Sequence, residues 1–262
     1  MIFPVSVFIF GAIVGSFLNV CIARIPEEES VVHPPSHCQN CKAPIAFYDN
    51  IPLLSYLILR GRCRSCNGPI AVRYIVVELL MASFAAALYA QFGLGLAFFV
   101  CFVFVAALIV ISFIDLAVMI VPDVISLPGI ILGLVFSLAG RYVIDDPFEI
   151  IPSPLSSLIG LLVGGGFLWA VGWVYEAFTK VEGMGGGDVK LLAMIGAFLG
   201  WQSLPATLFL ASVSGSVIGL TVMLVKRVGR RYPIPFAPFL CLGSLLYLFF
   251  GRDLIALYLY PQ

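Results

Sequence analysis

The fold is indicated first by the stretch MIFPVSVFIFGAIVGSFLNVCIA, residues 1–23, which is apolar almost throughout and carries no charged side chain. A helix needs about 20 such residues to cross the hydrocarbon core of a bilayer. No basic residue precedes this run, and the first positive charge, Arg24, follows it, which is the reverse of a secretory signal. We therefore expect a retained membrane-spanning helix.

Similar apolar runs recur along the rest of the chain. The 262 residues are 61% hydrophobic and 11% charged, whereas globular proteins average roughly 25% charged residues. We expect membrane spans at residues 2–23, 75–92, 96–114, 124–140, 154–177, 190–201, 205–225 and 235–250. The sequence thus predicts an all-α polytopic membrane protein with about eight transmembrane helices.

The placement of Lys and Arg predicts the orientation, because these residues are retained on the cytoplasmic side of membrane proteins. With the N-terminus outside, twelve of the fourteen Lys and Arg residues fall inside, and only Arg141 and Arg252 fall outside. The acidic residues Asp145, Asp146 and Glu149 also fall outside. We expect both termini outside.

Two polar side chains interrupt the first apolar run. Ser16 and Asn19 are expected to face protein, because an unpaired amide in hydrocarbon costs several kcal/mol. A close helix contact at the small residues Gly11 and Gly15 is the alternative to a substrate contact for this face.

Between the first two spans lies a polar insert with four cysteines. We divide the chain into a first transmembrane helix at 1–25, a cytoplasmic domain at 26–74 and a seven-helix membrane domain at 75–262. The insert contains CQNC, with Cys38 and Cys41, and CRSC, with Cys63 and Cys66. Two such knuckles suit tetrahedral Zn²⁺, although the spacer of 21 residues slightly exceeds the usual 15 to 20.

Cytoplasmic thiols are kept reduced, so we expect zinc rather than disulfides or a redox pair. Four thiolates leave no open position on the metal, and its role is therefore expected to be structural. His33 and His37 are alternative ligands or surface residues. The single cysteines Cys21, Cys101 and Cys241 are expected to face lipid or the core.

Chemistry within a membrane needs ionisable groups that a spanning helix normally excludes. The candidates are Glu78, Asp115, Asp123, Glu176 and Asp188. Both histidines lie in the insert and no HExxH motif is present, which excludes a usual serine hydrolase and a zinc protease.

Asp115 and Asp188 fall at the same predicted depth, where helix packing could bring them together. Two nearby carboxylates share one proton, so that one activates water while the other polarises a carbonyl, as in aspartyl proteolysis. The glycines of GMGGGD, residues 183–188, could adopt positive φ and let a substrate approach. Alternatively they form a flexible turn, with Asp188 as the N-cap of the next helix.

Three further polar residues have structural interpretations. We expect Asp123, which follows Pro122, to be a helix N-cap. Lys190 pairs either with a carboxylate or with lipid headgroups. Glu78 needs a partner, and Arg73 and Lys190 are the nearest charges that the topology allows.

These motifs resemble the type IV prepilin peptidases, which are bifunctional leader peptidases and N-methyltransferases. The matching pieces occur in the family's order at residues 15–26, 50–61, 70–78, 114–123, 183–192 and 234–240. The first knuckle departs from the family in lacking a proline after Cys38, and Ala237 replaces a usual glycine. Neither difference removes a carboxylate or a cysteine.

The resemblance implies that Asp115 and Asp188 are the catalytic pair of a GxGD-type aspartyl protease at the cytoplasmic face of the bacterial inner membrane. It implies prepilin or pseudopilin substrates with a basic leader before an apolar helix, which are cut after glycine. It also implies that the new N-terminus is methylated from S-adenosylmethionine, and that the insert binds zinc. We assign no methyl-donor contacts, because no GxGxxG loop follows a strand. Partners are membrane lipid and the substrate, and no nucleic acid is expected.

Two other functions use the same carboxylates. A proton-coupled transporter could relay protons through Asp115, Asp188 and Glu78, but we find no internal repeat of the kind that transporters show. A protease of the presenilin kind would need a Tyr before its first Asp, where this chain has Ile114.

Overall fold

A computed structural model describes residues 2–143, 151–180, 185–226 and 234–259 of the chain. The acidic segment of Asp145, Asp146 and Glu149 lies outside the described residues, as do Gly183, Met184 and the arginines between 227 and 231. The side chains of Arg141 and Arg252 are not described either. The chain forms two compact units, Met1–Val110 and Ile111–Gln262, and each is described by itself.

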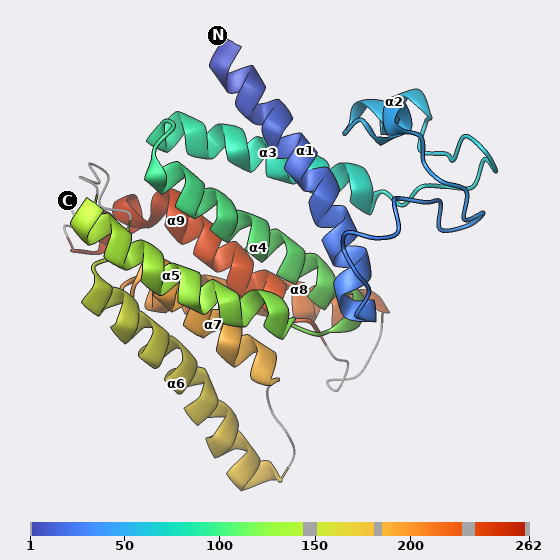
Figure 1. Ribbon diagram of the computed structural model, residues 1–262. Helices are drawn as coiled ribbons and strands as arrows, with labels where there is room; N and C mark the ends of the chain where they lie inside the picture. Colours follow the sequence, from blue (N-terminus) through green and yellow to red (C-terminus); the bar gives the residue numbers. More distant parts are fainter. Residues whose placement is uncertain (1, 144–150, 181–184, 227–233, 260–262) are drawn as a thin grey trace. The chain divides into compact units, whose positions relative to one another are not determined.

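Unit 1 contains two long helices, the insert and the first part of a third long helix (Figure 1). Its elements are α1 (Ile2–Arg24), η1 (Ile25–Glu27), η2 (Phe47–Asn50), α2 (Leu54–Ile58), α3 (Arg73–Phe92) and the start of α4 (Leu96–Val118). The helices α1 and α3 pack on each other. They bracket the insert in sequence, so the insert is attached to the packed pair at both of its ends.

Small residues allow α1 and α3 to approach closely. A Cβ on Gly11 would lie 2.7 Å from the Cβ of Ala85, and one on Gly15 would lie 2.7 Å from the Cα of Glu78. Asn19 is buried, and its amide donates to the carbonyl oxygen of Tyr74 at 3.0 Å. The prediction that this face of the first helix meets protein is confirmed.

Unit 2 is a helical bundle in which the short helix α7 is the most enclosed element. It contains the end of α4, α5 (Asp123–Val143), α6 (Pro154–Thr179), α7 (Gly186–Leu199), α8 (Ser203–Lys226) and α9 (Ala237–Leu259). Figure 1 shows α7 against both α5 and α6, and these pairs are in contact. Every residue of α7 from Leu191 to Leu199 is buried, so the surrounding helices fix its position.

The helices match the predicted spans to within a few residues at most of their ends. Within the part of the chain that the structure describes, six of them, α1, α3, α4, α5, α6 and α8, are long and apolar enough to cross a membrane. With 14 residues, α7 extends only about 21 Å, less than the roughly 30 Å of a hydrocarbon core. The described residues contain no β-strand. The chain is an all-α, multi-pass membrane protein, as predicted.

The contact between α6 and α7 predicts a steric sensitivity. A Cβ on Gly160 would press on the carbonyl oxygen of Gly196 and lie 2.8 Å from its carbon, whereas a Cβ on Gly166 would meet nothing within 4 Å. We expect Gly160→Ala to destabilise unit 2 by about 1–3 kcal/mol and Gly166→Ala to be neutral or slightly stabilising, since Ala favours helix. Thermal unfolding in detergent measures both, and equal midpoints would contradict this packing.

Candidate active site and metal centre

Asp115 lies near the end of α4 and meets the start of another helix of unit 2. Its side chain is buried, and Oδ2 accepts a hydrogen bond from the backbone N–H of Ala237 at 3.1 Å. Ala237 is the first residue of α9, where backbone N–H groups have no partner within the helix. A helix N-terminus stabilises negative charge. The start of α9 therefore provides one hydrogen bond that stabilises negative charge on Asp115.

Asp188 lies in the first turn of α7, where it is half-buried. The charge of Asp115 acts on the Asp188 carboxyl group, so these two acidic residues, distant in the sequence, lie within electrostatic range of each other in unit 2. The helix is capped by Gly185, without a side-chain cap. The alternative in which Asp188 is the N-cap is therefore wrong, and its carboxyl group is not engaged as a cap.

The glycines before Asp188 act through their small size. Among the described residues of this loop, Gly185 to Gly187, none has positive φ, so that expectation is wrong for this part of the loop. A Cβ on Gly187 would lie 2.8 Å from the Cβ of Val121, whereas Gly185 and Gly186 border open space. Gly187 thus allows α7 to begin against the turn that follows α4, and the open side at Gly185 and Gly186 leaves room for another chain.

This difference between adjacent glycines can be tested. We expect Gly187→Ala to displace the first turn of α7 from Val121, at a cost of about 1–3 kcal/mol, and to lower the rate of substrate cleavage. Gly186→Ala, in the same turn, should keep both stability and rate, because its Cβ would meet no atom within 4 Å. Rates and unfolding midpoints of the two variants should be compared side by side. A similar loss in both would point to backbone freedom rather than to the Val121 contact.

Asp123 forms an ion pair with Lys190, which lies two residues after Asp188 in the sequence. The ammonium group of Lys190 donates to both carboxylate oxygens of Asp123, at 2.7 and 2.8 Å. The helix α5 begins at Asp123, and its first helical bond runs from the N–H of Ser126 to the carbonyl of Pro122. Pro122 therefore holds the cap position, and the N-cap prediction for Asp123 is wrong. Such an exposed pair contributes about 0–1 kcal/mol.

The four cysteines of the insert come together. The sulfur atoms of Cys38, Cys41, Cys63 and Cys66 all lie within 4.8 Å of one another, and the Sγ atoms of Cys38 and Cys66 are 3.9 Å apart. All four are free thiols. A tetrahedral zinc site with Zn–S bonds of about 2.3 Å separates its sulfurs by about 3.8 Å. The arrangement fits a zinc site with four cysteine ligands, as predicted from the spacing.

The two knuckles repeat one backbone pattern. In the first, the backbone N–H of Cys38 donates to the carbonyl oxygen of Ala43, and the N–H of Lys42 donates to the carbonyl oxygen of Cys38, both at 2.9 Å. In the second, the N–H of Cys63 donates to the carbonyl oxygen of Gly68, and the N–H of Asn67 donates to the carbonyl oxygen of Cys63, again at 2.9 Å. Lys42 and Asn67 both have positive φ. The chain thus forms the same turn twice, so that each turn supplies two sulfurs to one centre.

The cysteine thiols of the cluster differ in their pKa values. Hydrogen bonds from the backbone N–H groups of Cys41 and Asn40 lower the pKa of the Cys38 thiol to about 6. At Cys66 the N–H of Gly68 lowers the pKa, but desolvation and the neighbouring thiols raise it to about 11. A cation that binds all four sulfurs must displace the remaining protons. Among the described residues only cysteines form this cluster, and the histidine alternative finds no support.

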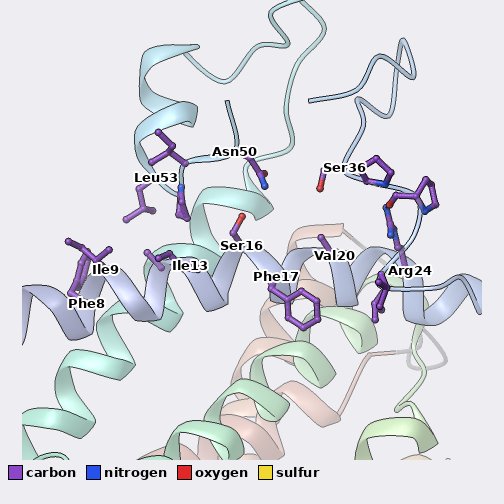
Figure 2. A pocket seen from close by; sticks show the side chains of 17 residues that line it. Phe8, Ile9, Ile13, Ser16, Phe17, Val20, Arg24, Ser36, Asn50 and Leu53 are labelled. Atoms are coloured by element: carbon purple, nitrogen blue, oxygen red, sulfur yellow. The ribbon is translucent and has the colours of Figure 1, made fainter. Parts of the chain in front are cut away.

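Glu78 has a partner that the sequence did not indicate. Its Oε2 accepts a hydrogen bond from the backbone N–H of Leu53 at 2.7 Å. This partner is a backbone group, and not the charged side chain of Arg73 or Lys190 that the sequence led us to expect. Beside this contact, a cavity of about 690 Å³ lies between one face of α1 and the insert. Figure 2 shows Ile13 and Ser16 of α1 and Leu53 of the insert lining it. The buried carboxylate thus ties the insert to the membrane helices of unit 1.

Comparison with known proteins places these features in a family. Residues 9–92 match the bacterial peptidase A24 N-terminal domain, and residues 102–220 match the type IV leader peptidase family. The chain is 38% identical to a prepilin leader peptidase/N-methyltransferase of Aeromonas hydrophila, over 97% of this chain and 92% of that protein. It is 35% identical to one from Burkholderia pseudomallei, over 93% of this chain and 84% of that protein.

A relative of the same name from Myxococcus xanthus is 40% identical over 88% of this chain and 66% of that protein. No solved structure matches the chain significantly. The first matched region contains the cysteine cluster and Glu78, and the second contains both Asp115 and Asp188. The chain therefore belongs to the type IV leader peptidase family, as its motifs indicated.

Proposed function

We propose that the protein is a membrane-embedded aspartyl endopeptidase that removes the basic leader of prepilins or pseudopilins at the cytoplasmic face of the inner membrane. The observation that supports this proposal is that Asp115 and Asp188, from two helices of unit 2, lie within electrostatic range of each other. The relatives are named prepilin leader peptidase/N-methyltransferase, which supports the same substrate class.

The surroundings of the two carboxyl groups suggest separate roles. Asp115 accepts the Ala237 N–H at the start of α9, which favours its charged form. Asp115 is then the base that takes a proton from water, whose oxygen attacks the scissile carbonyl carbon. Asp188, which carries the shared proton, donates it to the carbonyl oxygen. When the tetrahedral intermediate breaks its C–N bond, the leaving amine receives the proton that Asp115 holds, and one hydroxyl group of the intermediate returns a proton to Asp188 as the carboxyl product forms.

The open side of the α7 N-terminus is where the substrate strand enters. Neither Gly185 nor Gly186 has a neighbouring atom where a Cβ would stand, so an extended peptide can approach Asp188 closely. A substrate with a basic leader and an apolar helix places its cleavage point at the membrane surface, because the helix stays in lipid and the charges stay in water. This matches the position of Asp115 near the end of a membrane-spanning helix.

The second proposed activity is methylation of the new N-terminus, with S-adenosylmethionine as the donor. The names of the relatives and the match of residues 9–92 to the N-terminal domain of these enzymes support it. The zinc site supplies structure and not chemistry here, since four thiolates complete its coordination. We assign no residue to the methyl donor.

The function is tested with the full chain in liposomes and a synthetic substrate that has a basic leader, a glycine and an apolar helix. Mass spectrometry should show one cut after the glycine and, with S-adenosylmethionine added, the gain of one methyl group on the new N-terminus. Proton flux into the same liposomes should be absent. Proton uptake without cleavage would instead support the transporter alternative.

A further inference from the structure

The insert contains a segment, residues 50–58, that turns its apolar side chains outward. In α2, Leu54, Leu57 and Ile58 are 50%, 64% and 65% exposed, whereas Ser55 is buried. The Ser55 hydroxyl donates to the carbonyl oxygen of Tyr48 at 3.0 Å. A water-soluble domain buries its large apolar side chains and exposes its hydroxyl groups. This segment has the opposite arrangement, which suits a lipid environment.

Several backbone groups of the segment are hydrogen-bonded within the protein. Pro52 has no N–H, and the N–H of Ile51 donates to the Ser55 hydroxyl at 3.0 Å. The N–H of Ser55 returns a bond to the carbonyl of Ile51, also at 3.0 Å. Leu53, which has φ of 62°, donates its N–H to the Glu78 carboxylate. Irregular backbone is tolerated at membrane depth only where such partners exist.

The contacts of this segment place it beside the membrane helices and not beyond their ends. Glu78 lies five residues into α3 from Arg73, a rise of about 8 Å along the axis. Ser16, which lines the cavity beside Leu53, lies eight residues before the end of α1, or about 12 Å. Figure 2 shows Leu53 facing the same cavity as Ser16. The segment is therefore held beside α1 and α3 within the lengths of these helices that are apolar enough to cross a membrane.

From these observations we propose that segment 50–58 docks into the bilayer leaflet on the insert's side, with Leu54, Leu57 and Ile58 among the acyl chains. The occupant of this surface is lipid, because the surface continues the lipid-exposed faces of α1 and α3. The exposed side chains of Arg60 and Arg62 follow directly in the sequence, where they can reach anionic headgroups. The insert is then partly embedded, rather than wholly in water as its sequence suggested.

The test places a photo-crosslinking amino acid, p-benzoylphenylalanine, at single positions of the full chain in liposomes of phosphatidylethanolamine and phosphatidylglycerol. Leu57 and Ile58 are the test positions. Leu79, exposed on α3, is the lipid-facing control, and Ser65, exposed in the second knuckle, is the water-facing control. Mass spectrometry then identifies lipid adducts on each irradiated protein. Zinc content and unfolding midpoint show that each variant is folded.

We expect lipid adducts at Leu57 and Ile58 at the level found for Leu79, and far fewer at Ser65. A second measurement uses Leu57→Trp, whose fluorescence should be quenched by brominated lipid beyond the quenching of the parent protein. Adducts at the test positions no more frequent than at Ser65, together with an unquenched tryptophan, would overturn the proposal. So would adducts formed with a co-reconstituted substrate peptide in place of lipid, since they would assign this surface to a protein partner.

Discussion

Replacing Asp115 or Asp188 with Asn is expected to abolish leader cleavage, with a loss on the order of 10³-fold or more, because each carboxyl group performs one half of the proton transfer. In Asp115→Asn the amide keeps an oxygen that can accept the Ala237 N–H, so the contact between α4 and α9 survives the change. The assay is cleavage of the liposome-bound substrate at saturating concentration. Unfolding midpoints establish that both variants remain folded.

The matched control is Glu176→Gln, which makes the same change of carboxylate to amide on an exposed residue in the last turns of α6. Its rate should equal that of the unchanged protein. The double variant Asp115→Asn with Asp188→Asn should be no slower than either single one, since residues that act as a unit are not additive. If either single variant cleaved at a normal rate, or if the losses multiplied, the paired mechanism would have to be given up.

The number and order of the long helices could be predicted because most of the apolar runs have the length that a bilayer requires. The start of α7 was predicted at residue 190, yet the helix begins at Gly186. Glycine is the poorest helix former after proline, so the sequence favoured a loop. The first turn of a helix tolerates glycine when a tight contact demands it, and the contact of Gly187 with Val121 is such a case.

The candidate site could be predicted in its residue types but not in its supporting contacts. Apolar surroundings make acidic residues conspicuous, which singled out Asp115 and Asp188 from the sequence. The donor to Asp115 is a backbone N–H at Ala237, and the donor to Glu78 is a backbone N–H at Leu53. Such a backbone donor cannot be recognised from the residue type, because every residue except proline has a backbone N–H. The cysteine spacing, in contrast, indicated the four-cysteine cluster directly.

Removing two sulfurs of the cluster, as in Cys38→Ser with Cys63→Ser, is expected to eliminate zinc from a protein that otherwise carries about one ion per chain. Structural zinc contributes roughly 10–16 kcal/mol of apparent binding energy to the folding of small domains, so the insert should lose its fold. Elemental analysis measures the metal. Trypsin tests whether the insert is folded, since it should then cut faster after Arg60 and Arg62, whose backbone N–H groups are hydrogen-bonded in the intact insert.

Two controls distinguish a four-cysteine site from its alternatives. Cys21→Ser changes a buried cysteine outside the cluster, and His37→Ala removes the histidine next to Cys38; both variants should keep the metal. A disulfide arrangement predicts the reverse chemistry, because a reducing agent would open the insert and a chelator would not. The zinc site predicts that the chelator, but not the reducing agent, exposes all four thiols to alkylation. A metal-free protein that resists trypsin and keeps full activity would show that the knuckles hold together without an ion.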